Sequence, residues 1–588
     1  MRYLELLAPA RNSDIGIAAI DCGADAVYIG GPGFGARKDA GNSLSDIERL
    51  CAYAHTFGAR IFLTVNVTLE EGELEEVHDM MLRAQEAGVD AFIVRDPVIC
   101  TWEDITIPLH ASTQCALRDP VKAREYHSLG FSRLVLERQL SLDQVREVAA
   151  ATDAELEFFV HGALCTGYSG DCYLSEALSG RSANKGECIQ ACRSLYDLAD
   201  AKGNILVRNK ALLSLKDFNL LERLEDLAEA GVCSFKIEGR LKSISYVKNV
   251  VREYSLAFDR LVQKYPDKYA RASFGTVRGG FTPDSNKTFN RGYTQLFLDG
   301  KRGKWASMDA PKSMGECIGK VLSVQSTDKF NIRIMVKPLK GVSPLNNGDG
   351  FCFVDGFSIT GFRGDVCNGF EIRCKNIAGL KPGDTLYRNI NAAFEKELQA
   401  NMCQRLIPVG ISLKLSGSET LGYKVEATAA SQDGRSVYAS LETAGPAAQN
   451  KARMGSILQS QLSKTLAPYV FSPSGANVLT ADGSLPLLSA SALNGLCRSL
   501  AAELDKLPCG KVPRSGAPRP QGPVQKENAA PVNGELMRSK YCIRYELGIC
   551  PVHQGAAESG PLFLLNNGRR FALGFDCKHC EMTVKAAA

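Results

Sequence analysis

The chain has 588 residues, more than one hydrophobic core usually serves, so two to four domains are expected. Its 45% hydrophobic and 23% charged residues are ordinary for globular proteins, and a net charge of +4 is too small to identify a nucleic-acid-binding protein, although it does not oppose one. No apolar run reaches about 18 residues and no export signal opens the chain, which excludes a membrane partner and predicts a cytoplasmic protein with reduced cysteines.

Residues 1–260 alternate short apolar runs with amphipathic helical patterns. We predict strands at 3–6, 25–29, 60–66, 90–94, 107–110, 132–136, 155–160 and 232–237. The helices between them have recognisable ends, such as Ser43 or Ser45 before one helix and Gly58 after it. Eight such units predict an α/β fold with a TIM-type (β/α)8 barrel, and an open doubly wound sheet is the alternative.

Polar side chains follow these strands, at the end where a barrel carries its active site. Each of them alone is equally explained by helix capping or loop solvation. Together they predict proton transfer by His161 and Glu238, with Asn66 as a third catalytic candidate. The arginines among them suit carboxylates or phosphates, so we predict substrate binding by Arg95, His110, Ser112, Gln114, Arg138 and Arg240.

Four cysteines lie in the long insertion after the seventh strand, in the run HGALCTGYSGDCYLSEALSGRSANKGECIQACR. Their spacing, C-x6-C-x15-C-x3-C, is not a zinc-ribbon pattern, and it lacks the C-x3-C-x2-C of radical-SAM enzymes. In a reducing compartment, metal ligation explains such a group better than disulfides do. We predict an iron–sulfur cluster of the 4Fe-4S type, with structural zinc or unligated thiols as alternatives, at Cys165, Cys172, Cys188 and Cys192.

The rest of the chain predicts smaller domains. Strand runs broken by Gly, Asn and Asp indicate a small β-barrel, and a hairpin followed by helical patterns indicates an α+β domain. A proline-rich polar stretch is typical of a flexible linker. The predicted boundaries are 1–305 for the barrel with its insertion, 306–400, 401–512, 513–534 for the linker, and 535–588 for a cysteine-rich metal-binding module.

This last segment holds a second cysteine set. C-x7-C followed by C-x2-C is similar to a zinc-ribbon knuckle, and a segment with a modest apolar core would be stabilised by metal. His553 and His579 are candidate replacements for one cysteine, although solvent-facing histidines would have the same sequence. We predict zinc, with a second cluster or shared ligation as alternatives, at Cys542, Cys550, Cys577 and Cys580. Nearby basic residues suit RNA phosphates or a solvated face equally well.

Several runs carry a family resemblance, namely ELLAPA, GADAVYIGG, HASTQ, FVHGALCTGYSGDCYLS, CIQACR, FKIEGRLKS and NRGYTQLFL. In order and spacing they resemble the U-32 peptidase family over about residues 1–300, and members of that family are often labelled collagenase-like proteases. Several members are similar instead to oxygen-independent hydroxylases with a 4Fe-4S cluster. Some of those act on quinone precursors and others on pyrimidines in RNA, with prephenate implicated in the RNA reactions.

The resemblance implies cluster ligation by the four insertion cysteines. The second half resembles the extra domain of long members that modify ribosomal RNA, which short quinone-type members lack. It therefore implies an RNA-modifying enzyme, an iron–sulfur hydroxylase that forms 5-hydroxycytidine in large-subunit ribosomal RNA with prephenate as co-substrate. A peptidase and a non-catalytic RNA-binding or ribosome-assembly factor are the alternatives, although the sequence contains no H-E-x-x-H, G-x-S-x-G or P-loop motif.

Overall fold

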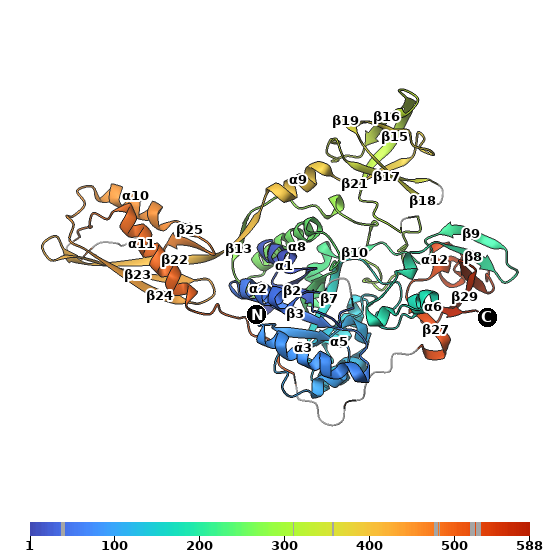
Figure 1. Cartoon of the computed structure of the whole chain (residues 1–588), viewed down its shortest axis with the longest axis horizontal. Helices are drawn as coiled ribbons and strands as arrows, with labels where there is room; N and C mark the ends of the chain where they lie inside the picture. Colours follow the sequence, from blue (N-terminus) through green and yellow to red (C-terminus); the bar gives the residue numbers. More distant parts are fainter. Residues whose placement is uncertain are drawn as a thin grey trace.

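The structure is a computed structural model that describes residues 1–36, 41–309, 311–355, 358–474, 480, 483–517, 524 and 531–587. A barrel formed by the first part of the chain lies at the centre, and three further β-rich parts surround it (Figure 1). Across the described residues, no helix has the length and hydropathy needed to cross a membrane.

Eight parallel strands form the barrel. They are β1 (Arg2–Pro9), β2 (Ala26–Gly30), β3 (Arg60–Val65), β4 (Ala91–Val94), β5 (Leu109–Ala111), β6 (Arg133–Val135), β7 (Glu155–Gly162) and β11 (Val232–Ile237). They pair in chain order, and β11 pairs with both β7 and β1, which closes the sheet. The predicted eight-stranded barrel is thereby confirmed over the open sheet. Each predicted strand overlaps an observed one, because strands covered on both faces have nearly continuous apolar sequences.

Helices cover the outside of the barrel. They are α1 (Ser13–Asp21), α2 (Leu44–His55), α3 (Leu74–Glu86), α4 (Pro120–Ser128), α5 (Leu142–Ala149), α7 (Leu224–Glu229) and α8 (Ile244–Lys264). At the start of α2, the hydroxyl of Ser43 accepts a hydrogen bond from the Asp46 N–H, as its predicted capping role requires. After this helix Gly58 has φ +63°, a left-handed conformation that suits glycine.

The barrel interior contains a buried ion network. Arg133 donates to Glu5 at 2.5 Å, to Glu155 at 2.6 Å and to Glu157 at 3.2 Å. The Lys236 ammonium lies 2.7 Å from the other Glu157 oxygen. Because the Arg133, Glu5 and Glu157 side chains are at most 1% exposed, each charge depends on these partners for compensation.

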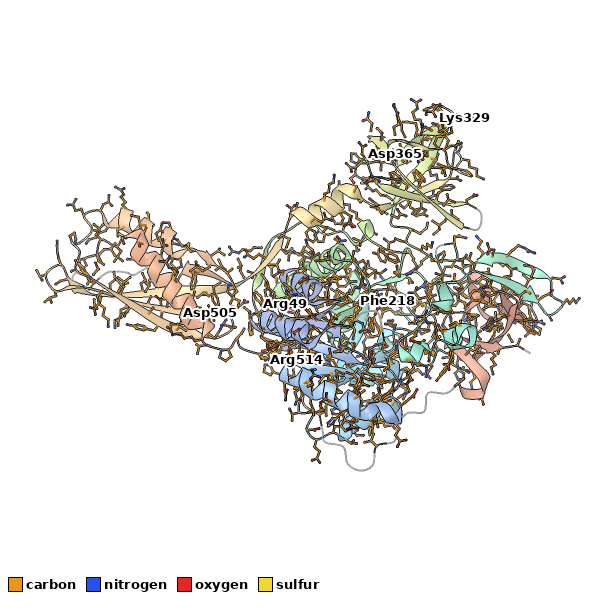
Figure 2. The ribbon with its side chains drawn as sticks, viewed as in Figure 1. Arg49, Phe218, Lys329, Asp365, Asp505 and Arg514 are labelled. Atoms are coloured by element: carbon orange, nitrogen blue, oxygen red, sulfur yellow. The ribbon has the colours of Figure 1, made fainter. Side chains whose placement is uncertain are left out.

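Residues 511–515, which span the predicted start of the linker at 513, are bound to the barrel. Lys511 pairs with Asp90 at 2.7 Å, and the backbone carbonyl of Val512 accepts a hydrogen bond from Arg60. Arg514 pairs with Glu5, so it joins the buried network; Figure 2 labels this side chain on the barrel. This stretch is therefore fixed by charge, since its cations neutralise carboxylates of the barrel strands and loops.

Arg133→Met should destabilise the protein by about 3–5 kcal/mol, because Glu5 and Glu157 would stay buried without their main partner. Urea unfolding of the variant and the wild type measures this difference. Arg146→Met is the matched control, since the Arg146–Asp143 pair is solvent-exposed and should contribute less than about 1 kcal/mol. Equal effects of the two substitutions would show that the network does not stabilise the barrel.

The insertion between β7 and β11 shares a sheet with the end of the chain. From the insertion come β8 (Tyr196–Asp200) and β9 (Ile205–Lys210), and from the end come β27 (Glu535–Ser539), β28 (Leu562–Asn566), β29 (Arg569–Asp576) and β30 (Glu581–Ala586). The strand order is β27-β30-β29-β28-β8-β9, and Leu564 of β28 lies opposite Leu198 of β8. The predicted separate C-terminal module is not confirmed, because so short a segment has too little apolar surface alone and packs with the insertion.

A seven-stranded antiparallel sheet with its own apolar core follows the barrel. Its strands are β15 (Glu316–Ser326), β16 (Asn331–Pro338), β17 (Gly350–Asp355), β18 (Ser358–Arg363), β19 (Val366–Asn368), β20 (Glu371–Lys375) and β21 (Thr385–Ile390). The helix α9 (Ala392–Ala400) leads from it to the next part (Figure 1).

An α+β part follows α9, in residues 403–505. Its strands are β22 (Cys403–Ser418), β23 (Gly422–Ser431), β24 (Ser436–Thr443), β25 (Thr465–Leu466) and β26 (Tyr469–Pro473), and its helices are α10 (Lys451–Leu462) and α11 (Ala490–Asp505). It is tied to the barrel part by β13 (Thr276–Gly279), which pairs with β22. Small elements complete the fold: α6 (Leu174–Ser179), β10 (Asp217–Asn219), β12 (Tyr269–Arg271), β14 (Tyr293–Thr294), α12 (Ile543–Glu546) and α13 (Pro551–Gln554).

Candidate functional site

A cavity of about 430 Å³ opens where β6, β7 and β11 end. Arg138 reaches it from the segment after β6, Cys165 from the segment after β7, and Glu238 and Lys242 from the segment after β11. Further lining residues come from the insertion. The cavity therefore lies at the carboxyl ends of the barrel strands, where the sequence predicted an active site.

The structure brings the four insertion cysteines together. Cys165, Cys188 and Cys192 line the cavity. Cys172 lies close enough to these three for their thiols to act on its own: burial raises the pKa of the Cys172 thiol, and the thiols of Cys192, Cys165 and Cys188 raise it further. The sulfur of Cys188 also lies 3.3 Å from the backbone N–H of Gln190, which donates to it. The structure therefore groups these four cysteines, and binding of a metal centre by them stays a prediction.

Four cysteine thiolates match the usual protein ligand set of a 4Fe-4S cluster, and cluster binding here stays a prediction. Within the described ranges, no three His, Cys, Asp or Glu side chains are gathered closely enough to hold one metal ion. Zinc would require four ligand atoms at about 2.0–2.3 Å from one point. Thiolates that bind a cluster need not converge in this way, because each of them binds a different iron atom.

Positive charge dominates the cavity wall. The guanidinium of Arg291 is held by Asp217 at 2.9 Å, and Arg193 donates to the Leu164 carbonyl at 2.9 Å. The ionisable lining side chains other than cysteine are five cations and two carboxylates: Arg138, Arg181, Arg193, Lys242, Arg291, Glu187 and Glu238. A pocket with this excess of fixed cations suits a small anion.

Among the predicted catalytic and substrate-binding residues, Arg138 and Glu238 line this cavity. Arg138 lies 3.7 Å from the Glu238 carboxylate and donates to the Ser169 hydroxyl at 2.9 Å. Its guanidinium also lies 3.7 Å from the centre of the Phe159 ring. These contacts hold the planar group in one orientation at the cavity wall, as binding of a carboxylate requires.

Arg95 and Arg240 are buried at the barrel mouth but do not line this cavity. Arg95 donates to the Gly170 carbonyl at 3.3 Å, and Arg240 donates to the Thr64 hydroxyl at 2.6 Å. Their observed contacts hold loops of the barrel mouth in place. Substrate binding by these two residues stays a prediction.

His161 is packed among aromatic rings beside the cavity. The centres of the Tyr254 and Tyr293 rings lie 5.5 and 5.6 Å from its ring centre. Burial lowers the pKa of His161 to about 3, so the imidazole is neutral at physiological pH. A neutral ring cannot act as a cationic proton donor there, and a role of His161 in proton transfer stays a prediction.

The other predicted residues support loops of the barrel mouth. Asn66 accepts a hydrogen bond from the Ala36 N–H at 2.9 Å and donates to Ser112 at 3.1 Å. Ser112 in turn accepts from the Gln114 N–H at 3.2 Å. Burial holds the pKa of His110 well below its usual value. Catalysis or substrate binding by these residues also stays a prediction.

Four cationic lining residues were not predicted as site residues, namely Arg181, Arg193, Lys242 and Arg291. Arg193 ends a short 3-10 helix in the insertion, and Lys242 and Arg291 lie in loops. Arg193, Lys242 and Arg291 each lie within a run that carries the family resemblance: CIQACR, FKIEGRLKS or NRGYTQLFL. The position of these residues in such runs could have identified them as site candidates from the sequence.

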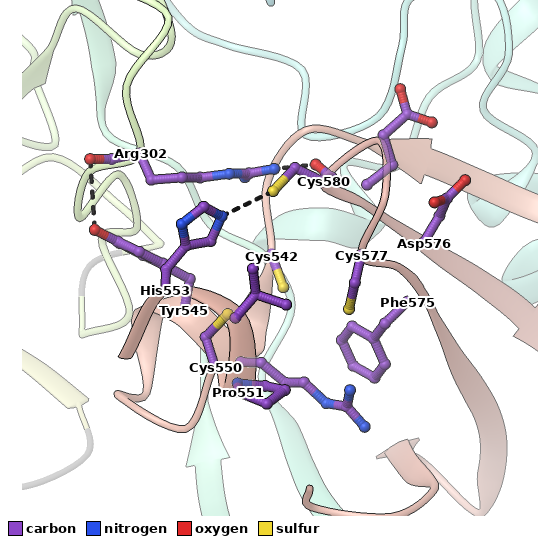
Figure 3. A pocket seen from close by; sticks show the side chains of 13 residues that line it. Arg302, Cys542, Tyr545, Cys550, Pro551, His553, Phe575, Asp576, Cys577 and Cys580 are labelled. Atoms are coloured by element: carbon purple, nitrogen blue, oxygen red, sulfur yellow. Dashed lines mark hydrogen bonds between the residues drawn. The ribbon is translucent and has the colours of Figure 1, made fainter. Parts of the chain in front are cut away.

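The C-terminal cysteines also come together. Cys542, Cys550, Cys577 and Cys580 line one small cavity, and His553 lies beside them with its Nε2 3.0 Å from the Cys580 sulfur (Figure 3). His579 is turned toward Asp576, with 2.8 Å between its Nδ1 and the carboxylate. Of the two candidate histidines, His553 therefore belongs to this site.

Known proteins resemble this chain over the barrel and, in one case, over nearly its whole length. Residues 12–307 match Peptidase family U32. The 23S rRNA 5-hydroxycytidine C2501 synthase of Escherichia coli is 36% identical, over 99% of this chain and 94% of its own length. The tRNA hydroxylation protein P1 of Bacillus subtilis is 33% identical over 54% of this chain and 77% of its own. A collagenase of Porphyromonas gingivalis is 30% identical over 51% of this chain and 75% of its own length. The chain belongs to peptidase family U32.

Proposed function

We propose that this chain is an oxygen-independent RNA hydroxylase that forms 5-hydroxycytidine in large-subunit ribosomal RNA. The observation that carries this proposal is the extent of similarity to the relative named for that activity, which is 36% identical over 99% of the chain. The transfer RNA hydroxylation protein and the collagenase match 54% and 51% of the chain. The parts beyond the barrel therefore favour ribosomal RNA as the substrate.

Cys165, Cys172, Cys188 and Cys192 are proposed to bind a 4Fe-4S cluster at the edge of the cavity. The cluster would supply redox chemistry when bound. Around it, the Gln190 N–H donates to the Cys188 sulfur, and the Ser175 hydroxyl lies 3.5 Å from that sulfur. Such contacts orient a thiolate and stabilise its negative charge.

The cavity is proposed to bind prephenate, a small dicarboxylate. Its volume of about 430 Å³ lies within the range of small-molecule pockets, roughly 300–1,000 Å³. Arg138, Arg193 and Arg291 present guanidinium groups, which bind carboxylates through paired hydrogen bonds. Glu238, 3.7 Å from Arg138, is the carboxylate placed to hold or move a proton beside the bound anion.

The β-rich parts outside the barrel are proposed to bind RNA. A cytidine must leave its stack before its ring can enter a cavity of this kind. The sheet that the insertion shares with the end of the chain exposes Arg569 and Arg570 on β29, and the turn after β29 exposes Lys578. These cations suit phosphate groups. These contacts would position the RNA while the barrel mouth receives the flipped base.

The direct test is a reaction under nitrogen with purified protein, prephenate and ribosomal RNA from a strain that lacks the chain. We expect 5-hydroxycytidine to form in the large-subunit RNA. The collagenase relative makes a peptidase the second candidate, so gelatin is incubated in parallel. Cleavage of gelatin without any change in the RNA would support the peptidase and contradict the hydroxylase.

Lys242 should make prephenate binding depend on pH. Burial lowers the pKa of Lys242 to about 8, so its positive charge is present below that pH and is lost as the pH rises through it. Affinity for prephenate should therefore fall between about pH 7 and pH 9, as measured by anaerobic calorimetry. Lys242→Arg keeps its charge throughout this range and should remove the fall. A parallel fall in both proteins would assign the dependence to another group.

A further inference from the structure

The four C-terminal cysteines surround a common space. Cys542, Cys550, Cys577 and Cys580 line the same cavity, and none of them is in a disulfide. Figure 3 shows their sulfur atoms turned toward this space from different sides, with His553 beside Cys580. Four reduced thiols directed into one small cavity are a metal-binding donor set.

Three separate segments bring these thiols together. Cys542 and Cys550 directly precede the short helices α12 and α13, whereas Cys577 and Cys580 lie in the turn between β29 and β30. In that turn Cys580 has φ +54°, a conformation that non-glycine residues rarely adopt. The turn thereby directs both of its cysteines into the cavity, and strained backbone of this kind is typical of functional sites.

Side chains of both charges line the cavity of the thiols, two arginines (Arg302 and Arg544) and two carboxylates (Asp576 and Glu581). The Nε2 of His553 lies 3.0 Å from the Cys580 sulfur, within hydrogen-bonding reach. Arg302 donates to the backbone carbonyls of Cys580 and Lys540, so its positive charge is fixed at the cavity wall. Arg544 lines the same wall, with its guanidinium 3.8 Å from the centre of the Phe575 ring.

We infer that Cys542, Cys550, Cys577 and Cys580 bind a second iron–sulfur cluster. The spacing of these cysteines predicted zinc, which would bring its sulfur ligands to about 2.3 Å from a single point. In the described part of the chain, no three potential ligands are gathered in that way. Thiolates spread around a cavity suit a cluster, in which each sulfur binds its own iron.

The site also explains how the end of the chain is held. Its ligands come from the C-terminal segment, and Arg302, from the end of the barrel part, is hydrogen-bonded to two of that segment's carbonyls. The same segment pairs through β28 with β8 of the insertion that carries the first cysteine set. Binding of the second cluster would therefore stabilise the C-terminal strands against the barrel.

The test measures iron, sulfide and zinc in the full-length protein purified without oxygen. Two 4Fe-4S clusters correspond to about eight iron and eight sulfide per chain, with no zinc. The double variant Cys577→Ser, Cys580→Ser should lose about half of the iron. Cys188→Ser, Cys192→Ser should lose the other half, so the two sites are distinguished by separate losses.

Cys317→Ser is the control, because Cys317 lies in β15, outside both cysteine sets, and this variant should keep all of its iron. Iron that remains in the C-terminal variant, with the absorption of the first cluster, shows that the barrel is still folded. One zinc per chain that is lost from this variant would overturn the inference. Unchanged iron content in the same variant would also overturn it. Neither result depends on whether the RNA is hydroxylated.

Discussion

Cys192→Ser is expected to reduce 5-hydroxycytidine formation to background, a loss of more than about 100-fold. Cys192 lines the cavity together with Cys165 and Cys188, and it lies near Cys172, whose pKa is raised by burial and further by the Cys192 thiol. A cluster that loses one thiolate has an iron without its protein ligand. Product is measured by nucleoside mass spectrometry, and cluster content by anaerobic absorption spectroscopy with iron analysis.

Cys100→Ser is the matched control for this variant, because Cys100 is a half-buried cysteine of the barrel part outside the cysteine group. It should keep both iron and activity. Full activity of the Cys192→Ser protein would contradict a role for the insertion cysteines in the reaction. Full activity of the Cys192→Ser protein after loss of its iron would show that the reaction does not need the cluster.

Arg138→Met is expected to raise the KM for prephenate by about 10- to 100-fold, with a smaller change in kcat. One charge-assisted contact contributes about 1.5–3 kcal/mol, and tenfold in affinity corresponds to about 1.4 kcal/mol. Arg138→Lys should restore part of the affinity, because lysine keeps the charge but loses the paired geometry. Steady-state kinetics under nitrogen, with prephenate varied, provide the measurement.

The control for this series is Arg223→Met. Arg223 pairs with Asp226 and Asp299 away from the cavity, so its removal should leave the KM for prephenate unchanged. An unchanged KM in Arg138→Met would show that this guanidinium does not contact the co-substrate. A fall in kcat alone would point instead to its contact with Glu238, 3.7 Å away.

The barrel could be predicted from sequence because its strands are covered on both faces. DAVYI and RIFLTVN are apolar runs bounded by turns, and they become β2 and β3. The shared sheet could not be predicted in this way. Its pairing of β8 with β28 joins residues more than 350 positions apart, since Leu198 lies opposite Leu564. Local periodicity carries no information about such a partner.

The candidate site was predictable where its residues are neighbours in the sequence. The four insertion cysteines are close along the chain, so their grouping was visible before their positions were known. The surroundings of His161 could not be predicted, because a polar residue at a strand end can point either toward the cavity or into the packed side chains around the barrel. Its burial among Tyr254 and Tyr293 depends on side chains from α8 and β14. Arg291 reaches the cavity from a loop whose path the sequence does not determine.

Nucleoside mass spectrometry of large-subunit ribosomal RNA, in a strain without this chain, is the most direct test of the proposed activity. We predict that 5-hydroxycytidine disappears from this RNA and that a copy of the wild-type chain restores it. The Cys192→Ser chain should not restore it. An unchanged amount of 5-hydroxycytidine in the strain without the chain would contradict the proposed function.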